Sequence, residues 1–242
     1  AAILNRNVVR RILWMVGLDT KYSRAVVVVA HADDAEWGWS GTVAKWCNNG
    51  WEVVYVLCTD GSKGTDDVKL TSEELVSIRE KEQLEAGEVL GVHNVVFLGY
   101  EDSMLEPTLN LRRDIVRQIR FYKPDILICL SPLRRLDGSS YFGHPDHLAS
   151  GEAALSAVFP SSRDRLTYPE LLEEGLEPHK VSEVWIMGHD DDDKFVDVTD
   201  YIDVAVSALK SHSSQTTGED VGQQLIDWRS HTGNKVGITL AK

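Results

Sequence analysis

The feature that most constrains the fold of this chain is a run of four valines, Val26–Val29, that polar residues follow at once. The run shows no alternation of apolar and polar positions, which indicates a strand buried on both faces, as in a parallel sheet covered by helices. His31, Asp33 and Asp34 come directly after it, at the sheet edge where open α/β sheets bind their ligands. The sequence therefore predicts an α/β fold with a polar site at the end of this strand.

Further apolar segments predict more buried strands, with helical stripes between them. We expect strands at 51–58, 95–98, 126–130, 184–187, 195–198 and 236–240, and helices at 42–49, 71–90, 109–122, 148–158, 199–211 and 218–228. Gly38 and Gly41 are expected to loosen the chain before the first of these helices. The alternation predicts a Rossmann-like three-layer sandwich with a mostly parallel sheet. No Gly-x-Gly-x-x-Gly follows the first strand, which argues against a dinucleotide site.

The length of 242 residues fits one domain. We expect a single domain over residues 1–242, with an N-terminal helical extension over about 1–22. The apolar stripe of residues 4–17 can pack on the domain or on a neighbouring subunit, so a homo-oligomer is one expectation. The apolar core at 13–18 is too short for a secretory signal. No apolar run approaches the ~20 residues of a membrane span, so none is expected.

The composition narrows the class of partner. The formal net charge is −13, which argues against nucleic acid and against anionic membranes, because both would be repelled. The four aspartates at 190–193 lack the spacing of an EF-hand, and a solvated turn is the simpler interpretation. The three cysteines, Cys47, Cys58 and Cys129, show no metal or redox spacing, which is typical of the reducing cytoplasm.

A second polar motif, His-Pro-Asp-His at residues 144–147, follows the strand expected at 126–130. Imidazole and carboxylate are ligands that Zn²⁺ favours, and a catalytic zinc ion takes three protein ligands with water in the fourth position. His31, Asp34 and His147 can supply those three. Fe²⁺ or another divalent metal ion can use the same ligands. The two motifs together predict a metal centre.

These motifs resemble those of the LmbE-like, or PIG-L, family of zinc-dependent de-N-acetylases. That family carries Ala-His-Pro-Asp-Asp-Glu after its first strand and His-Pro-Asp-His further on. Here the first motif reads Ala-His-Ala-Asp-Asp-Ala at 30–35, so Ala32 replaces the usual proline and Ala35 the usual glutamate, whereas the second is intact. The resemblance continues through 59–61, 79–80, 98–102 and 210–215, and covers nearly the whole chain from about Ser23. It implies a Rossmann-like fold and removal of the acetyl group from an N-acetylglucosamine-type substrate.

Asp33 directly precedes the expected ligand Asp34, so its carboxylate can lie beside a metal-activated water without binding the metal ion. The resemblance implies that Asp33 is the general base. The alternative is a carboxylate that only orients a ligand histidine.

His144 lies three residues before the expected ligand His147. A protonated His144 can stabilise the oxyanion, with the charge of Asp146 holding the ring and raising its pKa. The resemblance implies that His144 is catalytic and does not bind the metal ion. The competing interpretation makes it a fourth ligand.

Two positions outside the motifs match family positions near the substrate. The resemblance places Arg79 against hydroxyl or acyl oxygens and Asp102 against sugar hydroxyls. The alternative for Arg79 is a surface ion pair with Glu82, one helical turn further on. For His212, in the stretch 210–215, a structural role at a helix end is the simpler interpretation.

Four functions remain open at this point. The first is a zinc-dependent de-N-acetylase acting on a small amino-sugar substrate, and the second is an amidase acting on a sugar-linked conjugate. The third is a glycosidase that uses Asp33 and Asp34 as its paired carboxylates, although adjacent positions on one loop fit that chemistry badly. The fourth is a zinc- or sugar-binding module without activity, which Ala32 and Ala35 keep open.

Overall fold

In the part of the chain that the structure describes, five parallel strands form one sheet. A computed structural model describes residues 21–134, 136, 142–187, 193–216 and 220–241. The strands are β1 (Arg24–Val29), β2 (Glu52–Thr59), β3 (Asn94–Tyr100), β4 (Ile126–Leu130) and β5 (Glu183–Met187), in the order β3-β2-β1-β4-β5. The predicted helical extension at 1–22 and the aspartates at 190–193 lie almost entirely outside the described residues. The predicted α/β fold is confirmed.

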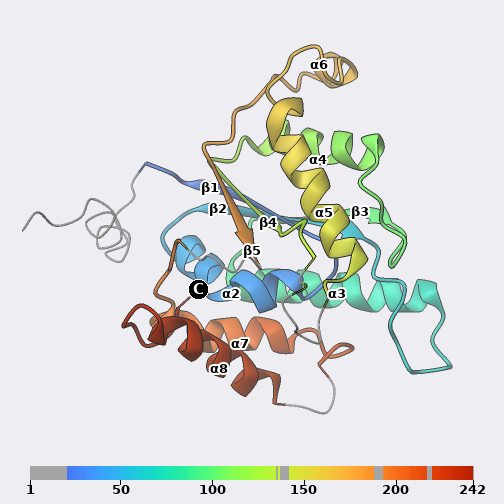
Figure 1. The fold of residues 1–242 in the computed structure, drawn as a ribbon. Coiled ribbons are helices and arrows are strands. Elements are labelled where there is room, and N and C mark those ends of the chain that lie inside the picture. The colour runs from blue at the N-terminus through green and yellow to red at the C-terminus, as the bar shows by residue number, and fades with distance from the viewer. Residues whose placement is uncertain (1–20, 135, 137–141, 188–192, 217–219, 242) are drawn as a thin grey trace, which may run out of the picture.

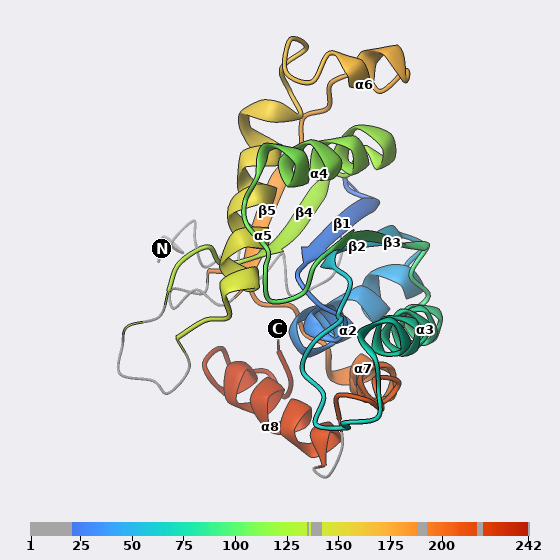
Figure 2. The same cartoon turned by 90° about the vertical axis from the view of Figure 1, so that its right-hand side faces the viewer.

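Helices cover both faces of the sheet (Figure 1). One layer contains α2 (Asp34–Asn48), α3 (Ser72–Leu90) and α7 (Ile202–Lys210), with α8 (Val221–Asn234) packed on α7. The opposite layer contains α4 (Leu109–Tyr122) and α5 (Pro145–Ser156), and the short α6 (Glu170–Glu173) lies beyond them (Figure 2). A π-helical turn at Ala157–Ser161 and a 3-10 turn at Thr199–Tyr201 complete the elements. The three layers agree with the predicted sandwich.

The valine run has the double-sided burial that its sequence indicates. Val27 and Val29 belong to the apolar cluster beneath α2 and α3, whereas Val26 and Val28 belong to the cluster beneath α4 and α5. All four are at most 1% exposed. Because successive side chains of a strand point to opposite faces, one run of β-branched residues stabilises both layers.

The sheet order reverses beside β1. The chain runs outward from β1 through β2 to β3, then returns to place β4 on the other side of β1. At such a switch point the connections leave the two central strands in opposite directions, which opens a crevice at their carboxyl ends. The motifs at 31–34 and 144–147 follow β1 and β4 and therefore meet at this crevice.

Helix α2 begins eight residues earlier than expected, so the predicted start at residue 42 is wrong. Gly38 and Gly41 lie inside the helix and do not loosen it. A Cβ atom on Gly38 would lie 2.2 Å from the sulfur of Met187, and one on Gly41 would lie 2.8 Å from Cβ of Val198. These two positions therefore require glycine because neighbouring side chains pack closely against the helix. The sequence alone does not distinguish such a glycine from one that ends a helix.

Other boundaries also differ. Helix α5 begins at Pro145 and not at residue 148, which puts His147 inside its first turn. The strands expected at 195–198 and 236–240 are absent from the described residues there, where one isolated bridge joins Asp197 to Ala241. By contrast, helix α3 agrees with the range predicted for it, and Thr71 and Glu74 form a capping box, which satisfies backbone N–H groups at the helix start.

Gly151 gives a testable prediction about the layer that carries His147. A Cβ atom at this position of α5 would lie 2.4 Å from the backbone oxygen of Leu130, in β4. We expect Gly151→Ala to lower the free energy of unfolding by about 1–3 kcal/mol, because backbone cannot move aside as a side chain can. Urea denaturation measures this, with the exposed neighbour Glu152→Ala as the control, expected within about 0.5 kcal/mol of wild type. A Gly151→Ala protein as stable as wild type would contradict the close approach.

Candidate active site

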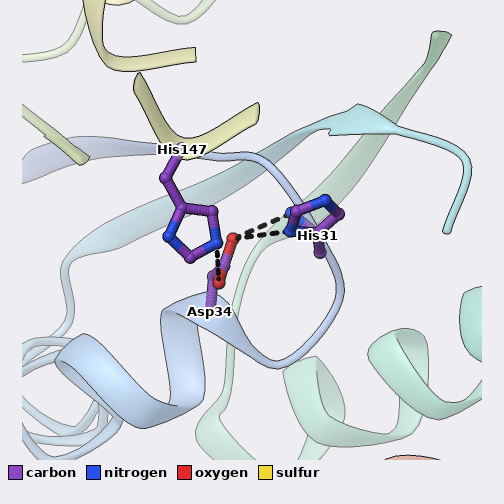
Figure 3. Close-up of side chains that lie close together, drawn as sticks. All are labelled: His31, Asp34 and His147. Atoms are coloured by element: carbon purple, nitrogen blue, oxygen red, sulfur yellow. Dashed lines mark hydrogen bonds and ion pairs between the residues drawn. The ribbon is translucent and has the colours of Figure 1, made fainter. Parts of the chain in front are cut away.

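Three side chains of the predicted metal centre lie together at the crevice. His31 follows β1, Asp34 is the first residue of α2, and His147 is in the first turn of α5. One carboxylate oxygen of Asp34 lies 3.0 Å from Nε2 of His147, and the other lies 3.7 Å from Nδ1 of His31. Figure 3 shows both rings directed at this carboxylate.

The backbone around Asp34 fixes the direction of its carboxylate. Asp33 has a left-handed conformation, with φ 82° and ψ −25°, which turns the chain sharply from the strand into the helix. The Oδ2 atom of Asp34 then accepts hydrogen bonds from the backbone N–H groups of Ala30 (3.1 Å) and His31 (2.9 Å). The carboxylate is thereby held between the end of β1 and His147.

This set of donors fits a divalent metal ion. One ligand atom from each of His31, Asp34 and His147 lies within 4.8 Å of the others, and two imidazoles with one carboxylate match the ligands of open catalytic sites. The Nε2 atom of His31 lies 3.2 Å from Asp102 and 3.1 Å from Asp146. A carboxylate behind a histidine is the usual support of a metal ligand, because it fixes the tautomer and orients the ring.

A second group, His31, His144 and Asp146, has similar spacing, but the contacts of Asp146 indicate a different role. Asp146 is fully buried and accepts hydrogen bonds from the backbone N–H groups of Ser103 (2.7 Å) and Leu105 (3.3 Å). With His31 as well, its oxygens already have three donors. We therefore interpret Asp146 as a group that orients His31.

Charge and burial shift the pKa values of the motif residues in opposite directions. Burial alone would lower the pKa of His31, but hydrogen bonds with Asp102 and Asp34 outweigh it and raise the value to about 11. The pKa of Asp34 is lowered, since hydrogen bonds and charge from His147 and His31 overcome its burial. Metal ligands must be deprotonated, so a metal ion bound at this site would displace the proton of His31.

Asp33 behaves differently from Asp34. Burial and the neighbouring charge of Asp34 raise the pKa of Asp33 to about 7. A carboxylate with such a pKa can take up and give back a proton near neutral pH, as a general base requires.

The predicted pairing of Asp146 with His144 is wrong, because the Asp146 carboxylate contacts His31 instead. The Nδ1 atom of His144 accepts a hydrogen bond of 3.2 Å from the backbone N–H of Asp146. The charge of Asp146 does favour the protonated ring, but burial and the charge of His31 outweigh it and lower the pKa of His144. Both observations favour a neutral His144 ring, with its hydrogen on Nε2.

Arg79 is buried, so the alternative of a surface ion pair with Glu82 is wrong. Its guanidinium group donates hydrogen bonds to the backbone oxygens of Gly61 (2.7 Å), Lys63 (2.6 Å) and Gly64 (3.3 Å). It also lies 3.5 Å from Asp102. Arg79 thus holds the loop after β2 against the site, and its contact with substrate stays a prediction, as does that of Asp102.

Comparison with known proteins identifies the family. The family model for GlcNAc-PI de-N-acetylase, PIG-L, matches residues 26–158, a range that includes both motifs. The chain belongs to the PIG-L family. Diacetylchitobiose deacetylase of Thermococcus kodakarensis is 33% identical over 192 residues, which are 79% of this chain and 70% of that protein. Mycothiol S-conjugate amidase of Streptomyces coelicolor is 30% identical over 173 residues, 62% of this chain and 56% of that one.

A solved structure of a PIG-L relative has the same fold. The structure of N,N'-diacetylchitobiose deacetylase from Pyrococcus horikoshii aligns with a TM-score of 0.82 and 27% identity, covering 99% of this chain and 92% of that one. The predicted resemblance and fold class are confirmed. Within the described residues, none of the helices has the length and apolar character that crossing a bilayer requires.

Sequence reasoning missed a buried polar group that lies behind this PIG-L site. Glu36 and His212 are both fully buried, and their side chains are 3.0 Å apart. Gln83, also fully buried, donates a hydrogen bond of 3.1 Å to Glu36. Glu36 is adjacent to Ala35, the position where the family motif has its glutamate. A glutamate one residue after this altered position was the sequence signal that could have pointed to the buried polar group. A structural role for His212 at a helix end, as the sequence suggested, does not include its contact with Glu36.

Proposed function

We propose that this protein is a zinc-dependent hydrolase that removes the acetyl group from an N-acetylglucosamine-type sugar. The observation that carries the proposal is the convergence of His31, Asp34 and His147 beside Asp33, whose pKa is raised to about 7, in a chain of the PIG-L family. The free thiols of Cys47, Cys58 and Cys129 support a reducing compartment such as the cytoplasm.

The residues of the site divide the chemistry between them. A zinc ion held by His31, Asp34 and His147 would supply an acidified water and polarise the amide carbonyl. Asp33 accepts the proton of the attacking water and then delivers a proton to the departing amine nitrogen. Its raised pKa suits both directions of transfer near neutral pH.

His144 contributes to this reaction as a neutral donor. Because its Nδ1 accepts the N–H of Asp146, its Nε2–H is the group that can donate to the developing oxyanion. Asp146 and Asp102 orient His31 through its Nε2 atom. Asp146 therefore acts through a metal ligand, and we expect Asp102 to do the same and, in addition, to accept a hydrogen bond from a sugar hydroxyl.

The His144→Ala variant tests the assignment of a donor role. We expect kcat to fall by ~10²–10³, the usual cost of one oxyanion donor, while zinc content stays at about one ion per chain. Metal analysis by inductively coupled plasma spectrometry together with acetate release measures both quantities. Loss of zinc from His144→Ala would instead make the residue a fourth ligand.

The function itself is tested by measuring acetate release from a panel of N-acetylated amino sugars, with sugar-linked amide conjugates beside them. The expected result is acetate release from at least one sugar, abolished by a chelator and restored by Zn²⁺. The amidase alternative, supported by the likeness to mycothiol S-conjugate amidase, predicts cleavage of a conjugate and no acetate. A zinc-loaded protein that cleaves neither class would reject both.

A further inference from the structure

Asp33 has a backbone conformation that its surroundings must maintain. Its φ of 82° lies in the left-handed region, which is unfavourable for a residue other than glycine. The backbone N–H of Asp33 donates a hydrogen bond of 3.3 Å to the side-chain oxygen of Gln83, on α3. This bond joins the turn that carries the proposed base to a helix of the layer beneath.

The orientation of the Gln83 amide is set by a second contact. Its Nε2 atom donates to one carboxylate oxygen of Glu36, at 3.1 Å. Because only the nitrogen of the amide can donate to a carboxylate, this contact directs the oxygen of Gln83 toward Asp33. The Glu36 acceptor therefore decides which end of the amide meets the turn.

Glu36 is in turn held by His212. The second carboxylate oxygen of Glu36 lies 3.0 Å from Nε2 of His212, in the segment after α7. His212 is 0% exposed, and hydrogen bonding and charge from Glu36 outweigh its burial and raise its pKa. The same segment is fastened nearby, since Gln215 donates to the backbone oxygen of Ala32 at 3.1 Å. The series of contacts thus runs from the segment after α7 through α2 and α3 to Asp33.

We propose that Gln83, Glu36 and His212 are positioning residues that hold Asp33 in the left-handed conformation needed by a general base. This inference rests on the proposed function. These residues act through the direction of their hydrogen bonds. The acceptor oxygen of Glu36 orients the Gln83 amide, and the oxygen of that amide holds the turn at Asp33. A displacement of ~1 Å at a reacting group costs about 10²-fold in rate, so loosening the turn lowers kcat more than substrate binding.

The adjacent Glu82 provides a matched control. It is also buried on α3 and also contacts the segment after α7, accepting hydrogen bonds from Ser213 (2.7 Å) and Ser214 (2.6 Å). No contact of Glu82 leads to Asp33 through a side-chain amide within the described residues. Variants at positions 82 and 83 therefore disturb the same two elements, but only those at 83 release the Asp33 N–H.

The test compares four variants of the full-length, zinc-loaded protein. We expect Gln83→Met and Glu36→Met to lower kcat by ~10–10²-fold with KM and zinc content within about twofold of wild type. Glu36→Gln keeps an acceptor for the Gln83 amide, and a change of the His212 tautomer accommodates its new donor, so kcat should recover to within about fivefold of wild type. Glu82→Met should lose stability but keep kcat within about twofold.

Three outcomes would overturn the inference. They are a Gln83→Met protein with wild-type kcat, a Glu82→Met protein as impaired as Gln83→Met, and a Glu36→Gln protein as impaired as Glu36→Met. The last result would assign the effect to the charge of Glu36 and not to its acceptor geometry.

A second readout keeps this test separate from the test of the function. Residue-resolved hydrogen exchange should show a protected Asp33 amide in wild type and in Glu36→Gln. In Gln83→Met and Glu36→Met, we expect that amide to exchange at least ~10-fold faster. If wild type releases no acetate, the proposed function fails, yet this exchange pattern still decides whether the three residues hold the turn. Equal protection in all variants would reject the positioning role.

Discussion

The His147→Ala variant is expected to lose its metal ion and, with it, more than about 10³-fold in kcat/KM. The imidazole of His147 lies 3.0 Å from the Asp34 carboxylate and is one of the three proposed ligands. Its removal leaves two ligands and an exposed gap, which hold a divalent ion weakly. Without the ion, several kcal/mol of transition-state stabilisation are lost. Metal content after dialysis and acetate release measure the two effects.

The control for this variant is His93→Ala. His93 is exposed beside the amino ends of β2 and β3, whereas the motifs follow carboxyl ends of strands, and its Nε2 atom lies 3.5 Å from Glu52, so metal content and rate should match wild type. A His147→Ala protein that retains one ion per chain would show that the ligand set is different. Activity without any bound metal ion would reject the metal centre itself.

Asp33→Ala is expected to retain the metal ion and to lose ~10²–10⁴-fold in kcat, the range of a general base. Burial and the charge of Asp34 raise the pKa of Asp33 to about 7, and only the deprotonated form accepts a proton. In wild type, kcat/KM should therefore rise with pH through the pKa of Asp33. A bound cation favours the charged carboxylate and moves this limb to lower pH.

The pH profile distinguishes the base from a support of the metal site. In Asp33→Ala we expect the rise of kcat/KM with pH to be absent, because the group whose deprotonation causes it has been removed. Asp60→Ala is a suitable comparison, since Asp60 accepts backbone N–H groups of Ser62 and Asp102 at the same sheet edge without being a proposed base. If Asp33→Ala instead loses zinc, and excess zinc restores turnover, Asp33 supports a ligand and is not the base.

Much of the fold was predictable because its strands carry an unambiguous signal. The valine run of β1 has no polar alternation, so burial on both faces was the only consistent interpretation. Helix α3 was also predictable, because its capping box and its end at Gly91 depend on a few adjacent residues. Gly38 and Gly41 misled the prediction of α2, because the partners that require them, Met187 and Val198, lie far away in sequence.

The site was predictable only to the level of its motifs. Both motifs end strands of a parallel sheet, so their convergence followed from topology. Which carboxylate supports which histidine did not follow, because Asp146 lies between His144 and His147 in sequence but its carboxylate contacts His31. The link from Asp33 to His212 was equally hidden, since it passes through single residues of separate helices. Family resemblance names motif positions and does not describe such contacts.

The reversal of strand order has a consequence for how metal and fold depend on one another. The ligands on either side of the switch point belong to opposite halves of the sheet, which meet only along the pairing of β1 with β4. An ion bound by both His31 and His147 would therefore connect the two halves of the sheet across this pairing. Binding of the ion to the native state would raise the free energy of unfolding by RT ln(1 + [metal]/Kd). We therefore expect a chelator to lower the free energy of unfolding, because the proposed ion would join the two halves of the sheet at its centre.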